Sequence, residues 1–496
     1  MQNIVMALDQ GTTSSRTILF DENGNIVASA GSAYSSSYPE SGWVEQDPED
    51  IWGSIKETIH QALSSANLEM KDISAIGITN QRETVIAWNS ETGEAIGPAI
   101  VWQCRRTADY CKELTAEGFD QTIRSKTGLV TDAYFSGTKM RWILKNRPEA
   151  KQLADQGKLK LGTVDSWLIW KLSGGQAHVT DATNASRTLV YNIFEGKWDD
   201  EILDKLEIPK DCLPEVKGSS EVVARTDAGE WGAATPIAGV AGDQHAALFG
   251  QACFDEGMAK STYGTGCFLL LNTGAKAVQS KNGLLTTIAW KIGNEVTYAL
   301  EGSVFISGAL VQWLRDKLEL FTDAAETEAM AMSVDSSDGL YLVPAFVGLG
   351  APHWDSYARG LMIGITQDTN KNHIVRAGLE AIAYQLYDLL KAIEQDAGTT
   401  IDVLRVDGGA TANNFLCQFQ SDILGCEVSR PETVETTAMG AAFLAGLAVG
   451  VWEDQDQIKQ LWREDRRFSP HMDAAKLEQR LTGWRKALER SKAWLD

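Results

Sequence analysis

The chain has 496 residues, more than a single hydrophobic core normally organises, so we expect at least two domains. Apolar residues make up 44% and charged residues 23%, an ordinary globular composition that argues against a disordered or fibrous protein. Acidic residues outnumber basic ones, 67 against 45, and the formal charge of −22 argues against a nucleic-acid partner and requires any phosphate site to be built locally.

The chain opens with a predicted β-hairpin. Residues 4–8 form an apolar run that predicts a buried strand, and a polar turn over 9–16 follows it. Residues 17–20 predict the second strand, and 26–30 should add a third. The hairpin therefore carries a polar tip.

An amphipathic helix is predicted over 47–66. Asp47 can cap its first turn, and Pro48 suits the first helical position, where a missing N–H costs nothing. A strand at 73–79 follows, so strands and helices alternate, which favours an α/β architecture. The predicted buried face of the helix consists of Ile51, Ile55, Ile59 and Leu63.

The second half repeats the design of the first hairpin. Residues 257–263 and 267–271 predict two strands, and the turn Gly264-Thr265-Gly266 separates them. A long helix with one apolar face is predicted over 374–393. The chain tail after residue 466 is charged and predicts a surface helix that carries Trp484.

A further strand at 403–406 leads into a third glycine turn, Asp407-Gly408-Gly409. Each half thus carries a hairpin with a polar or glycine-rich turn. We therefore predict two α/β domains, 1–250 and 251–496.

The seven cysteines and the apolar segments indicate in which cellular compartment the protein should be found. The cysteines are widely spread without a Cys-x-x-Cys pair, which argues against a disulfide framework or structural zinc. The N-terminus lacks the basic start and long apolar core of a signal peptide. The most apolar later stretch, 438–452, is shorter than the roughly 20 residues that span a bilayer. We expect a cytoplasmic protein without membrane insertion.

The turn over 9–16 carries the parts of a phosphoryl-transfer site. Glycine lets the backbone approach phosphate oxygens, hydroxyls and a guanidinium donate to them, and a carboxylate can hold Mg²⁺ directly or through water. Taken alone, the turn could equally be a hairpin tip rich in small polar residues. The Walker A, G-x-G-x-x-G and protein-kinase catalytic-loop patterns are absent from the sequence. The turn contains Asp9, Gly11, Thr12, Thr13, Ser14 and Arg16.

Nine segments spread over nearly the whole chain carry a more specific signal. They are LDQGTTSSR (8–16), GWVEQDP (42–48), GITNQRET (77–84), IVWQCRRT (100–107), YFSGTK (134–139), AGDQHAALFGQ (241–251), STYGTGCF (261–268), LRVDGGATANNF (404–415) and TAMGAAFLAGLAVG (437–450). This set resembles the FGGY family of carbohydrate kinases, within the actin, Hsp70 and hexokinase-like ATPase superfamily. The resemblance implies two ribonuclease H-like (actin-like ATPase) domains facing a central cleft. It also implies an ATP- and Mg²⁺-dependent kinase that converts glycerol to sn-glycerol 3-phosphate, with ADP as the second product.

The resemblance assigns the polyol to five side chains. Arg82 and Glu83 would supply a donor fork and an acceptor for hydroxyl groups, and Tyr134 a further hydroxyl contact. Trp102 and Phe268 would form an apolar wall against the carbon backbone. Without this context, an Arg-Glu pair would be read as a surface ion pair and each aromatic residue as plain core.

Asp243 matches the catalytic base of the family. A hydroxyl is a poor nucleophile at neutral pH, so a carboxylate within hydrogen-bond reach must accept its proton. Asp243 could also cap a helix, and both roles are compatible. Gln244 would orient the polyol. His245 stands where many relatives carry glutamine, and we interpret it as a structural variation.

The resemblance divides the nucleotide site between the two halves. Asp9 is expected to contact Mg²⁺ through water. The phosphate contacts are assigned to Thr12, Thr13, Ser14, Arg16 and Thr265, and the adenosine contacts to Gly308, Gln312, Gly409 and Asn413.

The resemblance also suggests a homodimer or homotetramer. Residues 227–235 lack the glycine-rich, arginine-containing stretch that binds fructose 1,6-bisphosphate in some relatives, and the chain lacks the histidine that is phosphorylated in others. Residues 470–480 show little that would dock a sugar-transport regulator. We therefore do not expect these three forms of regulation.

Two alternative functions remain open at this stage. One is an FGGY kinase that acts on a pentulose, a tetritol or a sugar acid. The small pocket implied by the three aromatic residues argues against this alternative. The other is an actin- or Hsp70-like ATPase that binds protein partners. Such a protein has no evident use for the pairs Arg82-Glu83 and Asp243-Gln244.

Overall fold

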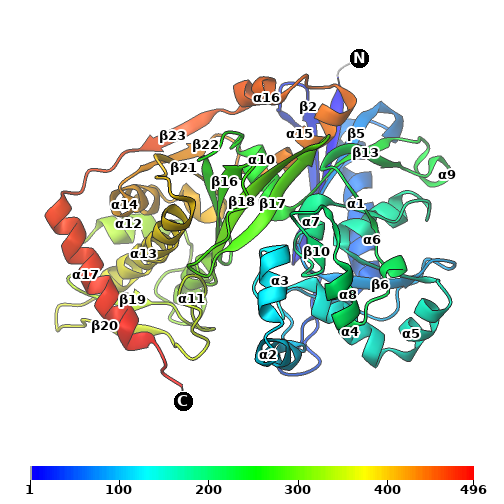
Figure 1. Cartoon of the computed structure of the whole chain (residues 1–496). Coiled ribbons are helices and arrows are strands. Elements are labelled where there is room, and N and C mark those ends of the chain that lie inside the picture. Colours follow the sequence, from blue (N-terminus) through cyan, green and yellow to red (C-terminus); the bar gives the residue numbers. More distant parts are fainter. Residues whose placement is uncertain (1–2, 496) are drawn as a thin grey trace.

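The computed structural model describes residues 3–495, and two mixed β-sheets organise it (Figure 1). The first sheet has six strands in the order β13-β14-β5-β1-β2-β3. The predicted first hairpin and third strand are confirmed. The strands are β1 (Ile4–Gln10), β2 (Ser14–Asp21), β3 (Ile26–Ala33), β5 (Ile73–Asn80), β13 (Ser220–Arg225) and β14 (Pro236–Gly242).

The second sheet has seven strands in the order β17-β18-β16-β15-β21-β22-β23. It contains the second predicted hairpin and the strand that precedes the third glycine turn. The strands are β15 (Ala259–Tyr263), β16 (Cys267–Gly274), β17 (Leu285–Ile292), β18 (Glu295–Val304), β21 (Val403–Asp407), β22 (Glu427–Pro431) and β23 (Glu464–Phe468).

The two sheets share one topology. In the first, β1 pairs antiparallel with β2 and parallel with β5; in the second, β15 pairs antiparallel with β16 and parallel with β21. Without the added edge strands β13, β17 and β23, both have the strand order 3-2-1-4-5 of a ribonuclease H-like unit. This repeat confirms the predicted α/β fold class.

The polar turn of the first hairpin is narrower than predicted. Asp9 and Gln10 belong to β1, and Ser14 already belongs to β2, so only residues 11–13 form the turn. Asp9 lies directly opposite Arg16 in the ladder. The prediction of a turn over 9–16 was wrong because backbone pairing continues through polar residues whose side chains find partners.

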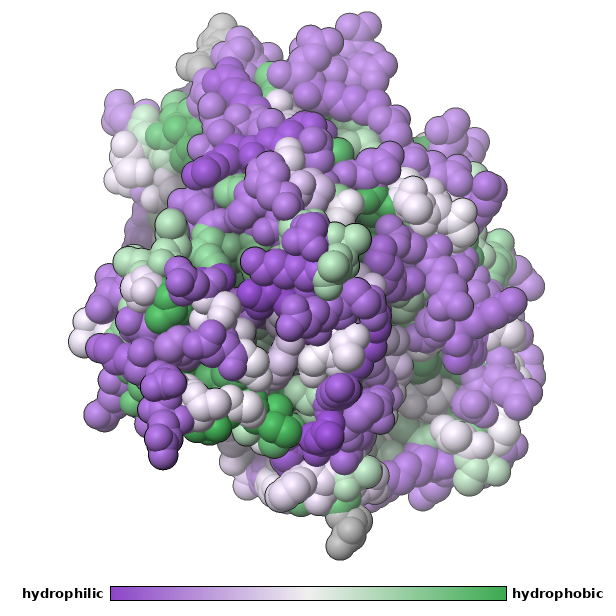
Figure 2. All heavy atoms as spheres, turned by 90° about the vertical axis from the view of Figure 1, so that its left-hand side faces the viewer, coloured by the Kyte–Doolittle hydropathy of each residue, from purple (hydrophilic) through white to green (hydrophobic). Residues whose placement is uncertain are grey.

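The predicted long helices are confirmed. They are α1 (Pro48–Ala66), which the Asp47 carboxylate caps through the Glu49 N–H, and α13 (Lys371–Ala397). The tail forms α17 (Ala474–Ser491), whose Trp484 is fully buried. Figure 2 shows that the face of the molecule beside this tail is largely hydrophilic. In the part of the chain that the structure describes, no helix is both long and apolar enough to cross a membrane.

A smaller four-stranded sheet was not predicted. Its order is β4-β7-β6-β8, and its strands are β4 (Glu45–Gln46), β6 (Val85–Asn89), β7 (Ala99–Ile100) and β8 (Leu159–Thr163). The shorter helices are α2 (Ala108–Ala116), α3 (Asp120–Thr127), α4 (Ser136–Asn146), α5 (Pro148–Asp155), α6 (Val164–Leu172), α7 (Ala182–Ala185), α8 (Asp200–Leu206), α9 (Ala228–Trp231), α11 (Gly308–Asp316), α12 (Glu326–Met332), α14 (Asn414–Leu424) and α16 (Gln455–Leu461). The remaining strands are β9 (Val179–Asp181), β10 (Tyr191–Asn192), β11 (Lys197–Trp198), β12 (Glu215–Lys217), β19 (Tyr341–Val343) and β20 (Leu361–Ile363).

Two helices join the halves of the chain. The helix α10 (Asp243–Gly250) packs against α15 (Thr436–Val449), which also covers β5 and β14 of the first sheet. In Figure 1, the orange α15 lies among the blue strands. A Cβ atom on Gly440 would lie 1.8 Å from the Ala246 carbonyl oxygen, so glycine permits this close approach. The second half of the chain thereby holds the helix that begins with Asp243.

We expect Gly440→Ala to lower the free energy of unfolding by about 1–3 kcal/mol, because the added methyl must push α15 away from α10. Gly53, on the exposed face of α1, is a matched control. No atom lies within 4 Å of a Cβ built there, so Gly53→Ala should stabilise the protein by about 0.5–1 kcal/mol through helix propensity. Urea unfolding of both variants measures the difference, and equal shifts would contradict the close packing.

Asp165 makes stability depend on pH. It is buried at the start of α6 and accepts hydrogen bonds from the hydroxyls of Thr163 (2.5 Å) and Thr180 (2.6 Å). Burial raises the pKa of Asp165 to about 7, from 3.8 for an ordinary aspartate. Between these pH values the folded state therefore holds more protons than the unfolded state, and the contribution of Asp165 to stability falls as pH rises.

The variant Asp165→Asn should lack this pH-dependent loss. Relative to the parent protein, its free energy of unfolding should improve by about 3–4 kcal/mol between pH 4 and pH 7.5. Urea unfolding of both proteins at the two pH values gives the comparison. A constant difference between the two proteins would show that Asp165 does not titrate in this range.

Candidate active site

The tip of the first hairpin holds two ion pairs, both made by the partly exposed side chain of Arg16. Arg16 donates from Nη2 to Asp9 Oδ2 (2.8 Å) and from Nη1 to both carboxylate oxygens of Glu435 (2.8 and 2.7 Å). Glu435 directly precedes α15, so the guanidinium ties the hairpin to the second half of the chain. Burial raises the pKa of Asp9, against the opposing effect of Arg16. Within residues 3–495, Asp9 Oδ1 has no hydrogen-bond partner and remains open to water or a cation.

The hydroxyl-rich turn lies beside the predicted polyol wall. The Gly11 N–H closes the turn on the Ser14 carbonyl oxygen (2.9 Å). Trp102 donates from Nε1 to Thr12 Oγ1 (3.0 Å), whereas the side chain of Thr13 is exposed. The turn and the wall therefore form one continuous surface.

A buried cluster of alternating charges contains Arg82 and Glu83. Arg82 donates to both carboxylate oxygens of Glu301 (2.5 and 3.0 Å), and its Nε lies 3.1 Å from Asp243 Oδ1. Arg187 donates to Glu83 (2.6 Å) and to Glu301 (3.0 Å). Arg82 is 3% exposed and Glu83 1%, so the alternative of a surface ion pair is wrong.

Sequence reasoning missed Arg187 and Glu301. Neither lies in a glycine turn, and each meets its partners across more than 100 residues of chain. The signal that could have revealed Glu301 is a carboxylate among the apolar and small residues of the second half of strand β18. Burial alone would raise the pKa of Glu301, but Arg187 and Arg82 lower it to about 2. Glu301 is therefore ionised and holds both guanidinium groups.

Three aromatic residues surround the charged cluster. The rings of Trp102 and Tyr134 meet edge to face with centroids 5.7 Å apart. The guanidinium of Arg187 lies 5.6 Å from the Tyr134 ring, and that of Arg82 lies 5.8 Å from the Phe268 ring. The structure thus gathers the three aromatic residues of the predicted polyol site around Arg82 and Arg187.

Asp243 begins α10 beside this cluster. The N-cap residue of the helix is Gly242, so the interpretation of Asp243 as the cap was wrong by one position. Its Oδ1 accepts a hydrogen bond from the N–H of Gln244 (2.7 Å) and forms an ion pair with Arg82 (3.1 Å). The side chain is 33% exposed, so a carboxylate oxygen remains accessible. A Cβ on Gly242 would lie 2.7 Å from the Arg82 side chain, and glycine is therefore required there.

His245 lies behind this surface. Its ring is completely buried, and Nε2 lies 3.1 Å from Thr287 Oγ1 in β17. Burial lowers the pKa of His245 well below its ordinary value, so the imidazole is neutral. This geometry supports a structural rather than a chemical role.

The second and third glycine turns meet at the end of β15. Thr265 follows Gly264, whose carbonyl oxygen accepts the N–H of Gly308 (2.9 Å) at the start of α11. A Cβ on Gly408 would lie 2.4 Å from the Tyr263 carbonyl oxygen, so the turn before Gly409 rests against β15. The two turns and the N-terminus of α11 form one edge of the second sheet.

Two predicted adenosine contacts lie on helices next to this edge. Gln312 is carried by α11, and Asn413 caps α14 through the Leu416 N–H (2.9 Å) while donating to Thr327 Oγ1 (3.1 Å). In residues 3–495, no hydrogen bond joins Gln312 to Asn413. The structure therefore brings Thr265, Gly308 and Gly409 together and places these two side chains on separate helices.

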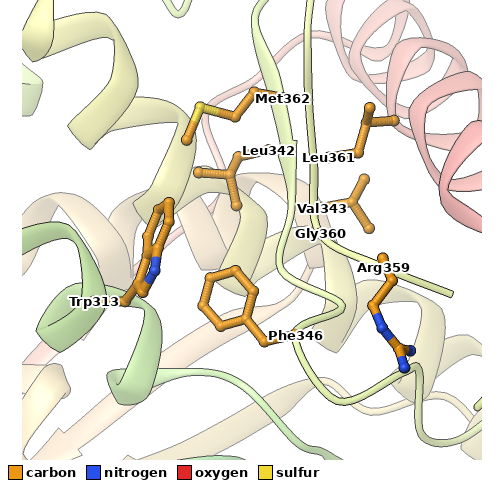
Figure 3. A pocket seen from close by; sticks show the side chains of 8 residues that line it. All are labelled: Trp313, Leu342, Val343, Phe346, Arg359, Gly360, Leu361 and Met362. Atoms are coloured by element: carbon orange, nitrogen blue, oxygen red, sulfur yellow. The ribbon is translucent and has the colours of Figure 1, made fainter. Parts of the chain in front are cut away.

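A pocket of about 490 Å³ lies beyond α11, between that helix and the β19–β20 hairpin. Figure 3 shows Trp313, Leu342, Phe346 and Met362 on one side of this hairpin. Its lining includes one cation, Arg359, and none of the predicted site residues. This pocket is therefore separate from the charged cluster around Asp243.

Two ribonuclease H-like units, each with a glycine- or hydroxyl-rich turn at the end of its first strand, define the class of actin-like two-domain phosphotransferases. The model of the N-terminal domain of the FGGY family of carbohydrate kinases matches residues 4–250, and that of the C-terminal domain matches residues 259–449. The chain belongs to the FGGY family of carbohydrate kinases.

Individual members of the family are similar to this chain over its full length. The chain is 56% identical over 496 residues to a glycerol kinase of Caldanaerobacter subterraneus subsp. tengcongensis, covering 100% of both chains. It is 58% identical over 494 residues to one of Clostridium botulinum, covering 100% of this chain and 99% of the relative. The crystal structure of Plasmodium falciparum glycerol kinase with ADP superposes with a TM-score of 0.92 at 39% identity, covering 99% and 98% of the two chains. A xylulose kinase from Lactobacillus acidophilus gives 0.87 at 25% identity, covering 99% of each.

Proposed function

We propose that the protein transfers the γ-phosphoryl group of ATP to a terminal hydroxyl of glycerol, giving sn-glycerol 3-phosphate and ADP. The accessible carboxylate of Asp243 carries the proposal, because it lies where the charged cluster and the aromatic wall meet. The full-length similarity to proteins named glycerol kinase supports the choice of polyol.

The polyol would bind against Trp102, Tyr134 and Phe268. Arg82 and Glu83 would contact its hydroxyl groups, as would the hydroxyl of Tyr134. Asp243 would accept the proton of the attacking hydroxyl as the phosphoryl group arrives. The pairing of Arg82 with Glu301 fixes the guanidinium before substrate binds, which favours a correctly oriented complex.

ATP would bind between the turns of the two sheets. The phosphates would contact Thr12, Thr13, Ser14 and Arg16 from the first sheet and Thr265 from the second. Gly308, Gln312, Gly409 and Asn413 would surround adenosine, as the resemblance predicts. Because the chain is strongly acidic, these local donors must supply the attraction for the anion.

Magnesium would neutralise charge on the phosphates when it is bound. Among residues 3–495, no group of three or more histidine, cysteine, aspartate or glutamate side chains could hold a metal ion. This fits a Mg²⁺ ion that is held mostly by phosphate oxygens and water. The unpartnered Oδ1 of Asp9 suits contact through water.

The domain assignments stay predictions. Residues 1–250 would bind the polyol and phosphate, and residues 251–496 would bind adenosine. Closure of the two domains would exclude water and so limit hydrolysis of ATP. A cytoplasmic location and a homodimer or homotetramer likewise stay predictions.

The test is ADP release from Mg·ATP by the purified protein with glycerol, dihydroxyacetone, erythritol, xylulose and gluconate. We expect the highest kcat/KM with glycerol. A preference for xylulose or gluconate would keep the kinase class and overturn the substrate. ADP release that is indifferent to every polyol would favour an ATPase that binds protein partners.

A further inference from the structure

Lys260 is an unusual lysine. It lies in β15 and is completely buried, although lysine is rarely enclosed without a carboxylate partner. Its ammonium group donates to Gln244 Oε1 (2.5 Å) and to Thr262 Oγ1 (2.8 Å). Among the described residues, no ion pair includes it. A buried charge held by neutral groups next to Asp243 calls for a reason in the site itself.

The contact fixes which way the amide of Gln244 points. An ammonium group can only donate, so its partner must be the amide oxygen. The Nε2 group of Gln244 must then point away from Lys260. Across residues 3–495, Nε2 donates to no protein group and is not enclosed, so it is free for a ligand.

This orientation suits the attacking hydroxyl. A hydroxyl that donates its proton to Asp243 can only accept hydrogen bonds from other neighbours. The N–H group of Gln244 is such a donor, whereas its oxygen would place a second acceptor next to the carboxylate. Lys260 thus decides whether Gln244 complements Asp243 or competes with it.

Lys260 also connects α10 to the second sheet. It lies four residues before Gly264, and its contact holds the first turn of α10. At the other end of that helix, Gln251 donates to Asp407 Oδ2 (2.7 Å), just before the third glycine turn. The helix that carries Asp243 is therefore held at both ends by the strands that lead into the second and third glycine turns.

We propose that Lys260 is a positioning residue, which holds Gln244 with its N–H group toward the polyol and ties α10 to the strand of the Gly264–Gly266 turn. The inference rests on the proposed function, because it assumes that Asp243 and Gln244 meet the same substrate. Burial lowers the pKa of Lys260, and Arg82 lowers it further, whereas the charges of Asp407, Asp243 and Glu301 oppose this shift and favour the ammonium form.

A double-mutant cycle between Lys260 and Gln244 tests the proposal. Lys260→Met keeps the apolar length of the side chain and removes the donor. We expect it to lower kcat/KM for the polyol by about 10–100-fold, with the Kd of ADP changed less than twofold. In the Gln244→Met background the same change should cost less than about threefold, because the contact is already absent. Additive losses in the two backgrounds would overturn the proposal.

Two further variants separate positioning from folding. Lys260→Arg keeps a cationic donor. The decrease in log(kcat/KM) for the polyol should therefore be at most half of the decrease seen in Lys260→Met. If Lys260→Met does not fold, Lys260→Gln replaces it in the cycle. Ser261→Ala is the matched control, because Ser261 lies on the other face of β15 and contacts Cys267 Sγ (2.9 Å). It should leave the KM of the polyol unchanged.

The cycle remains informative if glycerol is not the substrate. The polyol panel is measured first with the parent protein, and the cycle then uses the polyol that gives the highest kcat/KM. Failure of the glycerol assignment would thus appear in the panel. Failure of the Lys260 proposal would appear only as additivity in the cycle.

Discussion

Asp243→Asn should lower kcat with glycerol by about 10²–10⁴-fold, the range typical of a lost general base. Asn retains an oxygen at the position of Oδ1, which accepts the hydrogen bond from the Gln244 N–H and still faces Arg82. The substitution therefore keeps the local geometry and removes the capacity to take a proton. Steady-state ADP release with saturating ATP and glycerol measures the loss.

A matched control is Asp227→Asn. Asp227 also accepts a backbone N–H at the start of a helix, from Gly229 (3.1 Å), and it lies outside the site. We expect its kcat to stay within twofold of the parent protein. If Asp243→Asn kept more than about a tenth of kcat with an unchanged fold, another group would have to be the base.

The parts of the fold that could be predicted are those whose signal is local. The apolar run over 4–8 and the polar residues after it predicted the first hairpin, and the cap at Asp47 predicted α1. The tail was predicted only as a surface helix that carries Trp484, whereas the partner of this side chain, Tyr384 of α13 with ring centroids 5.3 Å apart, was not predicted. The burial of Trp484 depends on where a distant helix lies, which no local pattern encodes.

The candidate site likewise contains residues that local motifs predict and residues that only the folded structure reveals. Asp9, Arg82 and Asp243 lie in motifs that resemble the family, so they could be nominated from the sequence. Arg187 and Glu301 complete the charge balance around them, yet each is an isolated charge in its own segment. A buried guanidinium needs a carboxylate, but the sequence does not say which one reaches it. Only the packing of β18 beside the first half of the chain answers that question.

Glu301→Gln should affect both stability and substrate binding. Glu301 is the shared acceptor of Arg82 and Arg187, so its loss leaves two buried guanidinium groups with too little negative charge. Breaking a buried ion pair from one side costs about 3–5 kcal/mol, and we expect a loss of this size in urea unfolding. Because Arg82 also loses its anchor, the KM of glycerol should rise at least about tenfold.

Glu380→Gln separates these two effects. Glu380 is equally buried in α13 and accepts hydrogen bonds from Arg376 (2.9 Å) and Arg480 (3.1 Å), which belong to neither predicted binding site. Its substitution should cost a similar free energy of unfolding and leave the KM of glycerol within twofold. A rise in KM that is equal in both variants would mean that lost stability, rather than a misplaced Arg82, weakens binding. An unchanged KM in Glu301→Gln would mean that the guanidinium keeps its position through Asp243 and Glu83 alone.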